Sequence, residues 1–204
     1  MRSTTRTVLI LLITTLWVPA CHDGKDSATE TVAEAPVSLA ADKPFVPGGK
    51  IDVDLDGGAY EIKTAADNHI RVSASDTRTT KVDVAIDGSQ ANIKVKDTPH
   101  SNFRAIIEVP SVGDIVVRLS GGELKMNAMT GNNDVESYGG NVQITVGDAK
   151  DYAHVDAAVK AGDLDASPFG GSKSGLLQEF TWSGDGKYTL RAHLGAGNLV
   201  LSSK

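Results

Sequence analysis

Residues 113–147 read GDIVVRLSGGELKMNAMTGNNDVESYGGNVQITVG, and they decide the fold because glycine recurs in them at a fixed interval. Gly113, Gly122, Gly131 and Gly140 are separated by three successive steps of nine residues. Repetition at a fixed period indicates a repeated structural unit. Because glycine takes the positive φ that a tight corner needs, each block of nine is expected to be one strand followed by its turn.

Within these blocks apolar and polar residues alternate, as they do in a strand that buries one face. Asn133 departs from this pattern, because it occupies a position that Leu124 and Val142 fill in other blocks. This predicts a buried asparagine at a corner or in a ladder of asparagines. The residues expected to point inward are Ile115, Val117, Leu119, Leu124, Met126, Val142, Ile144 and Val146, and those expected to point outward are Arg118, Glu123, Lys125, Asn141, Gln143 and Thr145.

Similar short runs extend through residues 48–204, where no window shows a long apolar stripe at helical spacing. The sequence therefore predicts one all-β domain over residues 48–204. The repeated Gly-x-apolar-x-apolar blocks favour a β-solenoid, a parallel β-helix-like stack of short glycine-punctuated strands. The alternative is an antiparallel β-sandwich or barrel.

Two stretches near the C-terminus match each other, AAVKAGDLDAS at 157–167 and AHLGAGNLVLS at 192–202, and predict two strands of similar shape. Between them, residues 168–187 form an insertion in which we expect neither strand nor helix around 171–175. We expect the aromatic residues in and after this insertion to cap the open end of the core. Their alternative role is an aromatic platform that contacts a ligand. These residues are Phe169, Phe180, Trp182 and Tyr188.

Residues 1–20 have the features of a secretory signal peptide, with Arg2 and Arg6 ahead of an apolar run. That run is about half the ~20 residues that a transmembrane helix needs. Val18-Pro19-Ala20-Cys21 resembles the lipobox of bacterial lipoproteins, whose cysteine becomes the lipidated first residue. Because the chain has one cysteine, we expect lipidation at Cys21. Under the sorting rule of enteric bacteria, His22 implies transfer to the outer membrane, and the alternative is ordinary secretion with a free thiol.

Residues 21–47 comprise the lipidated cysteine and a stretch rich in Ala, Asp, Glu, Ser, Thr and Pro, which we expect to be a disordered tether. Removing residues 1–20 takes away two arginines and no acidic residue, which leaves 18 Lys and Arg against 26 Asp and Glu, a net charge of −8. This acidic balance argues against nucleic-acid binding. Membrane contact is expected through the acyl anchor.

Four short motifs carry a resemblance to a known family: Gly122-Glu-Leu-Lys, Gly140-Asn-Val-Gln-Ile, Ala161-Gly-Asp-Leu-Asp and Ala196-Gly-Asn-Leu-Val-Leu. From about Gly48 to Ser203 the chain resembles the bacterial β-strand-repeat domains of unknown function that are often labelled putative adhesins. The resemblance implies an envelope-facing β-solenoid. It supplies no catalytic residues.

We find no catalytic or cofactor-binding pattern in the sequence. Residues 131–134 resemble one turn of a calcium-binding nonapeptide, but such sites repeat on adjacent turns, so an ordinary Asn/Asp turn is expected. The acidic stretch 148–165 is expected to be a solvated face. His154 and His193 lie near the two matched stretches, and a shared metal site is the alternative to surface imidazoles. The glycines of residues 171–175 lack the spacing of a serine hydrolase motif.

We therefore expect a non-catalytic cell-envelope lipoprotein without cofactor or metal, an adhesin-like structural or interaction module of the outer membrane that faces the periplasm or the cell surface. Its partners would be the membrane, through the lipid anchor, and an unidentified envelope protein or glycan. We do not expect it to bind nucleic acid. The alternative is a carbohydrate-active enzyme or carbohydrate-binding β-helix, an analogy from fold alone. A carrier of small apolar ligands would need a hollow interior, whereas Leu124 and Ile144 indicate a filled one.

Overall fold

The structure is a computed structural model that describes residues 36–204. This part contains strands and two short 3₁₀ helices but no α-helix, which confirms the all-β class. None of its helices is long and apolar enough to cross a membrane. The strands are β1 (Ser38–Pro44), β2 (Lys50–Leu55), β3 (Gly58–Thr64), β4 (His69–Ala74), β5 (Lys81–Asp87), β6 (Gln90–Lys96), β7 (Arg104–Val109), β8 (Asp114–Leu119), β9 (Gly122–Asn127), β10 (Asn133–Val146), β11 (Tyr152–Ala166), β12 (Gly171–Ser183) and β13 (Tyr188–Ser203), and the 3₁₀ helices are η1 (Ala149–Asp151) and η2 (Ser167–Phe169).

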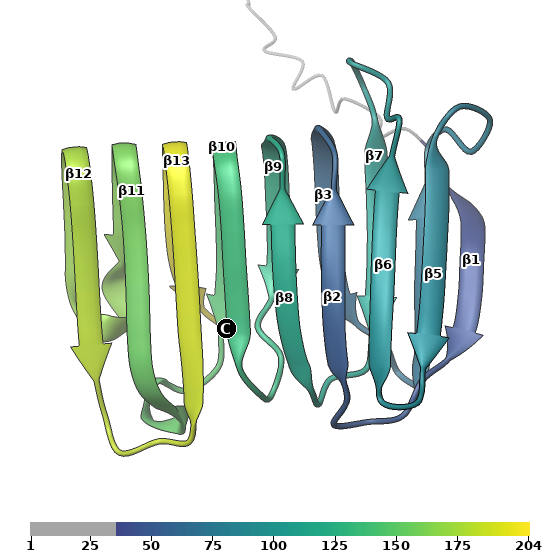
Figure 1. The fold of residues 1–204 in the computed structure, drawn as a ribbon. Coiled ribbons are helices and arrows are strands. Elements are labelled where there is room, and N and C mark those ends of the chain that lie inside the picture. Colours follow the sequence, from purple (N-terminus) through teal and green to yellow (C-terminus); the bar gives the residue numbers. More distant parts are fainter. Residues whose placement is uncertain (1–35) are drawn as a thin grey trace, which may run out of the picture. The chain divides into compact units, whose positions relative to one another are not determined.

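The strands form one sheet that curls until it is nearly closed (Figure 1). Its main path runs β1-β4-β7-β3-β9-β10-β8-β2-β6-β5, and β13, β11 and β12 follow one another outward from β10. The two end strands of the main path, β1 and β5, contact each other. Nζ of Lys43 on β1 donates a hydrogen bond to the carbonyl oxygen of Val84 on β5. The barrel alternative fits this nearly closed shape.

Strands in the middle of the sheet pair in parallel, and strands at its ends pair antiparallel. β8 is parallel to β2 and β10, and β13 is parallel to β10 and β11. The antiparallel pairs are β1 with β4, β4 with β7, β5 with β6 and β11 with β12. The nearly closed sheet is therefore mixed, and not antiparallel throughout as the barrel alternative assumed.

The nine-residue spacing of glycine comes from two corners that alternate along the chain, and each corner recurs on a neighbouring strand: Gly140 lies beside Gly122, and Gly131 lies beside Gly113. β10 bends at Gly139-Gly140, so that its first half pairs with β8 and its second half with β9. Gly140 stands in register between Gly122 and Gly197. An added Cβ on Gly140 would lie 1.8 Å from the carbonyl oxygen of Gly122, and the φ of Gly140 is 111°. Only glycine meets both conditions.

The two matched stretches, predicted as two strands of similar shape, lie side by side in the sheet. β11 and β13 align Ala157 with Ala192 and Leu164 with Leu199. β13 nevertheless lies between β10 and β11, although it comes after β12 in the chain. β12 makes this possible, because it runs antiparallel along β11 and returns the chain to the beginning of β11. The next strand can then run parallel to β11 along its other edge.

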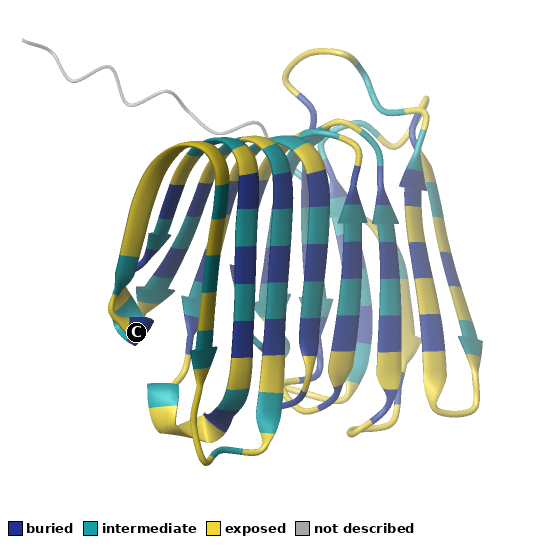
Figure 2. Cartoon of the chain, turned by 60° about the vertical axis from the view of Figure 1, so that its left-hand side comes forward, coloured by how far each residue is buried: buried dark blue, intermediate teal, exposed yellow. Residues whose placement is uncertain are grey.

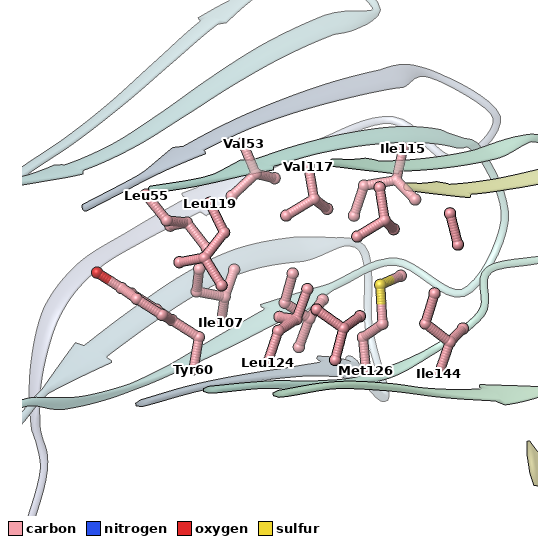
Figure 3. Close-up of a cluster of buried hydrophobic side chains, with 14 of the residues drawn as sticks. Val53, Leu55, Tyr60, Ile107, Ile115, Val117, Leu119, Leu124, Met126 and Ile144 are labelled. Carbon is pink, nitrogen blue, oxygen red and sulfur yellow. The ribbon is translucent and has the colours of Figure 1, made fainter. Parts of the chain in front are cut away.

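Buried and more exposed residues alternate along most strands of the curled sheet (Figure 2), and the buried ones form one hydrophobic core. The eight residues of 113–147 that were predicted to point inward are each at most 3% exposed, which confirms the alternation. Figure 3 shows Val117 on one wall of the core and Leu124 and Ile144 on the facing wall. Leu199, on the C-terminal strand, is 1% exposed and belongs to the same core.

The start of the domain and the strand β12 differ from the sequence-based expectation. The folded part begins at Ser38 and not at Gly48, because β1 pairs with β4 inside the stretch predicted to be a tether. β12 is a strand where we expected no regular structure. Six of the seven residues of β1 are exposed, and residues 172–177 of β12 are exposed as well. β1 and the first half of β12 therefore lack the alternation that reveals a strand in a sequence, and only residues 178–183 of β12 alternate. The predicted signal peptide and Cys21 lie outside the described residues.

Candidate functional site

Charged side chains line up across four neighbouring strands on the outer surface of the sheet. β8, β10, β13 and β11 are parallel and in register, so equivalent outward positions stand next to one another. One row joins Arg118, Glu136 and His193, and a second joins Asp134, Arg191 and Asp156. We refer to these six side chains as the charged network: Arg118, Asp134, Glu136, Asp156, Arg191 and His193.

Both arginines of the charged network bind both carboxylates of β10. Nη1 of Arg191 lies 2.5 Å from Oε1 of Glu136 and 3.3 Å from Oδ1 of Asp134. Nε of Arg118 lies 3.1 Å from Oε2 of Glu136, and Nη2 of Arg118 lies 3.4 Å from Oδ2 of Asp134. The hydrogen bond from Arg191 lowers the pKa of Glu136, and the carboxylate raises the pKa of Arg191 in return. Glu136 is therefore held in its ionised form.

His193 is held in one tautomer by its two neighbours. Its Nδ1 lies 3.1 Å from Nη2 of Arg191, and its Nε2 lies 2.9 Å from Oδ2 of Asp156. Because a guanidinium can only donate, Nδ1 of His193 accepts this hydrogen bond. Nε2 then carries the proton and donates a hydrogen bond to Oδ2 of Asp156. Both ring nitrogens of His193 are thus engaged within the charged network.

A groove of about 590 Å³ extends from the charged network toward the bend in the strands. It is flanked by Tyr138 of β10, which is 85% exposed, and by Lys160 of β11, which is also exposed. Gly195 of β13 lies between them and adds no side chain to the floor. A Cβ on Gly195 would lie 2.2 Å from the carbonyl oxygen of Tyr138, so close backbone approach requires this glycine. We refer to this feature as the charged groove, with Arg118, Glu136, Tyr138, Lys160, Arg191 and His193 on its walls.

The charged groove combines an ordered part with two side chains that are available to a ligand. The carboxylates and guanidiniums of the network hold one another, whereas Tyr138 and Lys160 make none of the side-chain hydrogen bonds or ion pairs found within residues 36–204. Such a surface can bind through an aromatic ring, a cation and fixed polar groups. In the same part of the chain, no group of three His, Cys, Asp or Glu side chains is placed to hold a metal ion.

The four aromatic residues singled out from the sequence lie outside the charged groove. Phe169 of η2 is 8% exposed, and its ring centroid lies 5.5 Å from that of Tyr152 and 5.2 Å from that of Trp182. Phe180, Trp182 and Tyr188 are partly buried and pack against the same core. This packing is that of a cap over the end of the core. Contact of these rings with a ligand stays a prediction.

Asn133 is buried at a corner, as its position in the third block predicts. It is 1% exposed, and its Nδ2 donates to the carbonyl oxygens of Met129 at 3.0 Å and Gly131 at 2.9 Å. Its Oδ1 accepts a hydrogen bond from the amide of Met129 at 2.9 Å. The turn is closed by its own polar groups, as expected for an ordinary asparagine turn.

The histidines and acidic residues near the matched stretches serve separate local roles. His193 is in register with Ala158, whereas His154 is in register with Thr189. The two histidines are therefore separated by about 13 Å along the strands, too far to share one metal ion.

Asp148 accepts a hydrogen bond from the amide of Lys150 at η1. Asp165 does the same for Ser167 at η2.

The charged network was not predicted from the sequence, although Arg118 was assigned to the outer face. The alternation around Val135 and Ala192 gave a usable signal, because it assigns Asp134, Glu136, Arg191 and His193 to outward positions. The sequence does not tell which strands are neighbours, so it does not show that these four side chains lie side by side.

No family model matches the sequence, and no curated protein sequence matches it. Among solved structures, the fold is similar to that of a putative cell adhesion protein from Clostridium sporogenes ATCC 15579, with a TM-score of 0.50 and 12% identity over 83% of this chain and 100% of that chain. A putative adhesin from Parabacteroides merdae ATCC 43184 matches at 12% identity over 82% of this chain and 78% of that chain, but its TM-score of 0.25 supports no structural argument. At these identities the likeness concerns the fold alone.

Proposed function

We propose that this protein is a non-catalytic, adhesin-like interaction module of a bacterial cell envelope and that the charged groove is its binding surface. The observation that carries the proposal is the charged network, in which Glu136, Arg191 and His193 hold one another while Tyr138 and Lys160 stay available. Binding costs less free energy when the contacting side chains are already ordered. The similarity in fold to a putative cell adhesion protein agrees with this role.

The chemistry of the charged network favours binding over the alternative of carbohydrate cleavage. A glycosidase needs a carboxyl group with a raised pKa to act as general acid, whereas Arg191 lowers the pKa of Glu136. A general base needs a free nitrogen or oxygen, and both nitrogens of His193 are engaged. The test is incubation of the protein with polygalacturonate followed by a reducing-end assay. Release of reducing ends that Glu136→Gln abolishes would contradict the non-catalytic role.

The proposal includes a lipid anchor at Cys21 that holds the domain at the outer membrane, facing the periplasm or the cell surface. It rests on the resemblance of residues 18–21 to a lipobox and on the signal-like residues before it. Wild-type protein should fractionate with membranes, and Cys21→Ser protein should be soluble. Protease treatment of intact cells then distinguishes the two faces. A Cys21→Ser variant that still needs detergent for release would contradict the anchor.

We also propose that the curled sheet is a β-solenoid, in which two strands joined by a glycine corner form one rung. The parallel register and the aligned corners support this arrangement. A solenoid tolerates an added rung, so a tandem duplication of residues 113–130 should keep the strand content and a cooperative melting curve. Loss of cooperative melting would contradict it. The aligned corner residues are Gly58, Gly122, Gly140, Gly197 and Gly162.

A further inference from the structure

We infer that the charged groove binds an acidic sugar unit, whose ring packs on Tyr138 and whose carboxylate pairs with Lys160. The inference rests on the proposed binding function and adds the chemical class of the ligand. Its starting point is the pair of side chains that flank the charged groove and have no partner within residues 36–204.

The spacing of these two side chains suits a single sugar ring. Tyr138, Gly195 and Lys160 occupy neighbouring positions on β10, β13 and β11. Adjacent strands lie about 4.8 Å apart, which places the Cα atoms of Tyr138 and Lys160 about 10 Å apart. The bare backbone of Gly195 forms the floor of this slot. The phenol ring of Tyr138 is 85% exposed, so it offers an apolar face to the C–H groups of a sugar.

The charges around the slot favour a negatively charged ligand at its Lys160 side. The guanidiniums of Arg118 and Arg191 are compensated by Asp134 and Glu136. The ammonium group of Lys160 has no such carboxylate within residues 36–204, so it is the uncompensated cation of the charged groove. A carboxylate is a strong hydrogen-bond partner for a lysine ammonium group. The ordered guanidinium and carboxylate groups can exchange hydrogen bonds with the sugar hydroxyls.

The position of the charged groove within the sheet favours a sugar over an acidic peptide. Extended peptides are commonly recognised through the unpaired backbone of an edge strand. The charged groove instead lies over β10 and β13, each of which is paired on both sides. Recognition must therefore come from side chains, and these can contact the hydroxyl and carboxylate groups of a sugar.

The test is isothermal titration of the full chain carrying Cys21→Ser with polygalacturonate. Fully methyl-esterified polygalacturonate is the matched neutral probe, and poly-L-glutamate is the peptide probe. We expect binding to polygalacturonate alone. Tyr138→Ala and Lys160→Gln should each weaken it by roughly tenfold, and the loss caused by Lys160→Gln should shrink at high salt. Two exposed residues that do not line the charged groove serve as controls. Lys125→Gln on β9 and Leu176→Ala on β12 should change the affinity for polygalacturonate less than twofold.

Each other outcome overturns the inference. Equal binding to the methyl ester would exclude a role for the carboxylate. Binding to poly-L-glutamate alone would assign the charged groove to acidic peptides and leave the proposed interaction function intact. Binding to none of the probes would remove the acidic-sugar assignment, while the envelope function would still be decided by the fractionation and reducing-end experiments. Binding that survives both groove substitutions would place the ligand elsewhere on the domain.

Discussion

Replacing Gly140 by alanine should destabilise the domain far more than the same change at Gly175, although both glycines stand in one row of corners. The backbone strain is similar, because φ is 111° at Gly140 and 121° at Gly175. The surroundings differ. An added Cβ on Gly140 would lie 1.8 Å from the carbonyl oxygen of Gly122, whereas the nearest atom to a Cβ on Gly175 is the side-chain Nε2 of Gln178 at 3.4 Å.

The expected magnitudes follow from these distances. Alanine held at a φ of 111–121° costs roughly 1–3 kcal/mol, and this is the whole cost expected at Gly175. At Gly140 the Cβ would also lie roughly 1.5 Å inside ordinary contact distance, so β9 and β10 must separate at the corner. Losing two or three backbone hydrogen bonds there adds about 1–1.5 kcal/mol for each. We therefore expect Gly140→Ala to cost about 3–7 kcal/mol in total.

Urea unfolding followed by circular dichroism measures this difference. Both variants are made in the full chain carrying Cys21→Ser, and the free energies of unfolding are compared with that of the parent. The reasoning would be refuted if Gly140→Ala and Gly175→Ala lost equal stability, because the close approach of the strands would then contribute nothing. Equal slopes of the unfolding curves are the check that both variants unfold from the same native state.

Three further predictions concern the core and the charged network. Asn133→Leu leaves three backbone groups without their buried partner and should cost about 3–5 kcal/mol in urea unfolding; a loss under 1 kcal/mol would contradict the importance of this corner. Leu199→Asp should prevent folding, since it buries a carboxylate, whereas Val200→Asp on the outer face should keep the circular dichroism spectrum and cost less than about 1 kcal/mol. Because Arg191 lowers the pKa of Glu136 from its ordinary 4.5, the stability due to Glu136 is complete above about pH 4.5 and is lost as pH falls through the lower native value. Glu136→Gln should therefore flatten the acid side of a stability profile, and an unchanged profile would contradict the pairing.

For residues 113–147, the sequence alone determined which side chains are inside and where the chain turns a corner. Alternation assigned residues such as Leu124 and Ile144 to the core, because a strand has only two faces. The spacing of Gly122 and Gly140 located the corners, because a corner with positive φ and close backbone approach admits only glycine. The match between residues 157–167 and 192–202 predicted two strands of similar shape, and these are β11 and β13. These features depend on residues that are close along the chain or on repeated motifs, and both can be read directly from a sequence.

Only the tertiary structure decided which strands became neighbours, and so which residues form the charged groove. β12 turns back along β11, and β13 therefore inserts between β10 and β11 instead of extending the sheet in chain order. This places Arg191 beside Asp134, 57 residues away, and brings Tyr138 and Lys160 to either side of Gly195. Period-two alternation is the same whichever strand lies alongside, so it carries no information on strand order. Packing of the whole core selects that order, and the candidate site is its consequence.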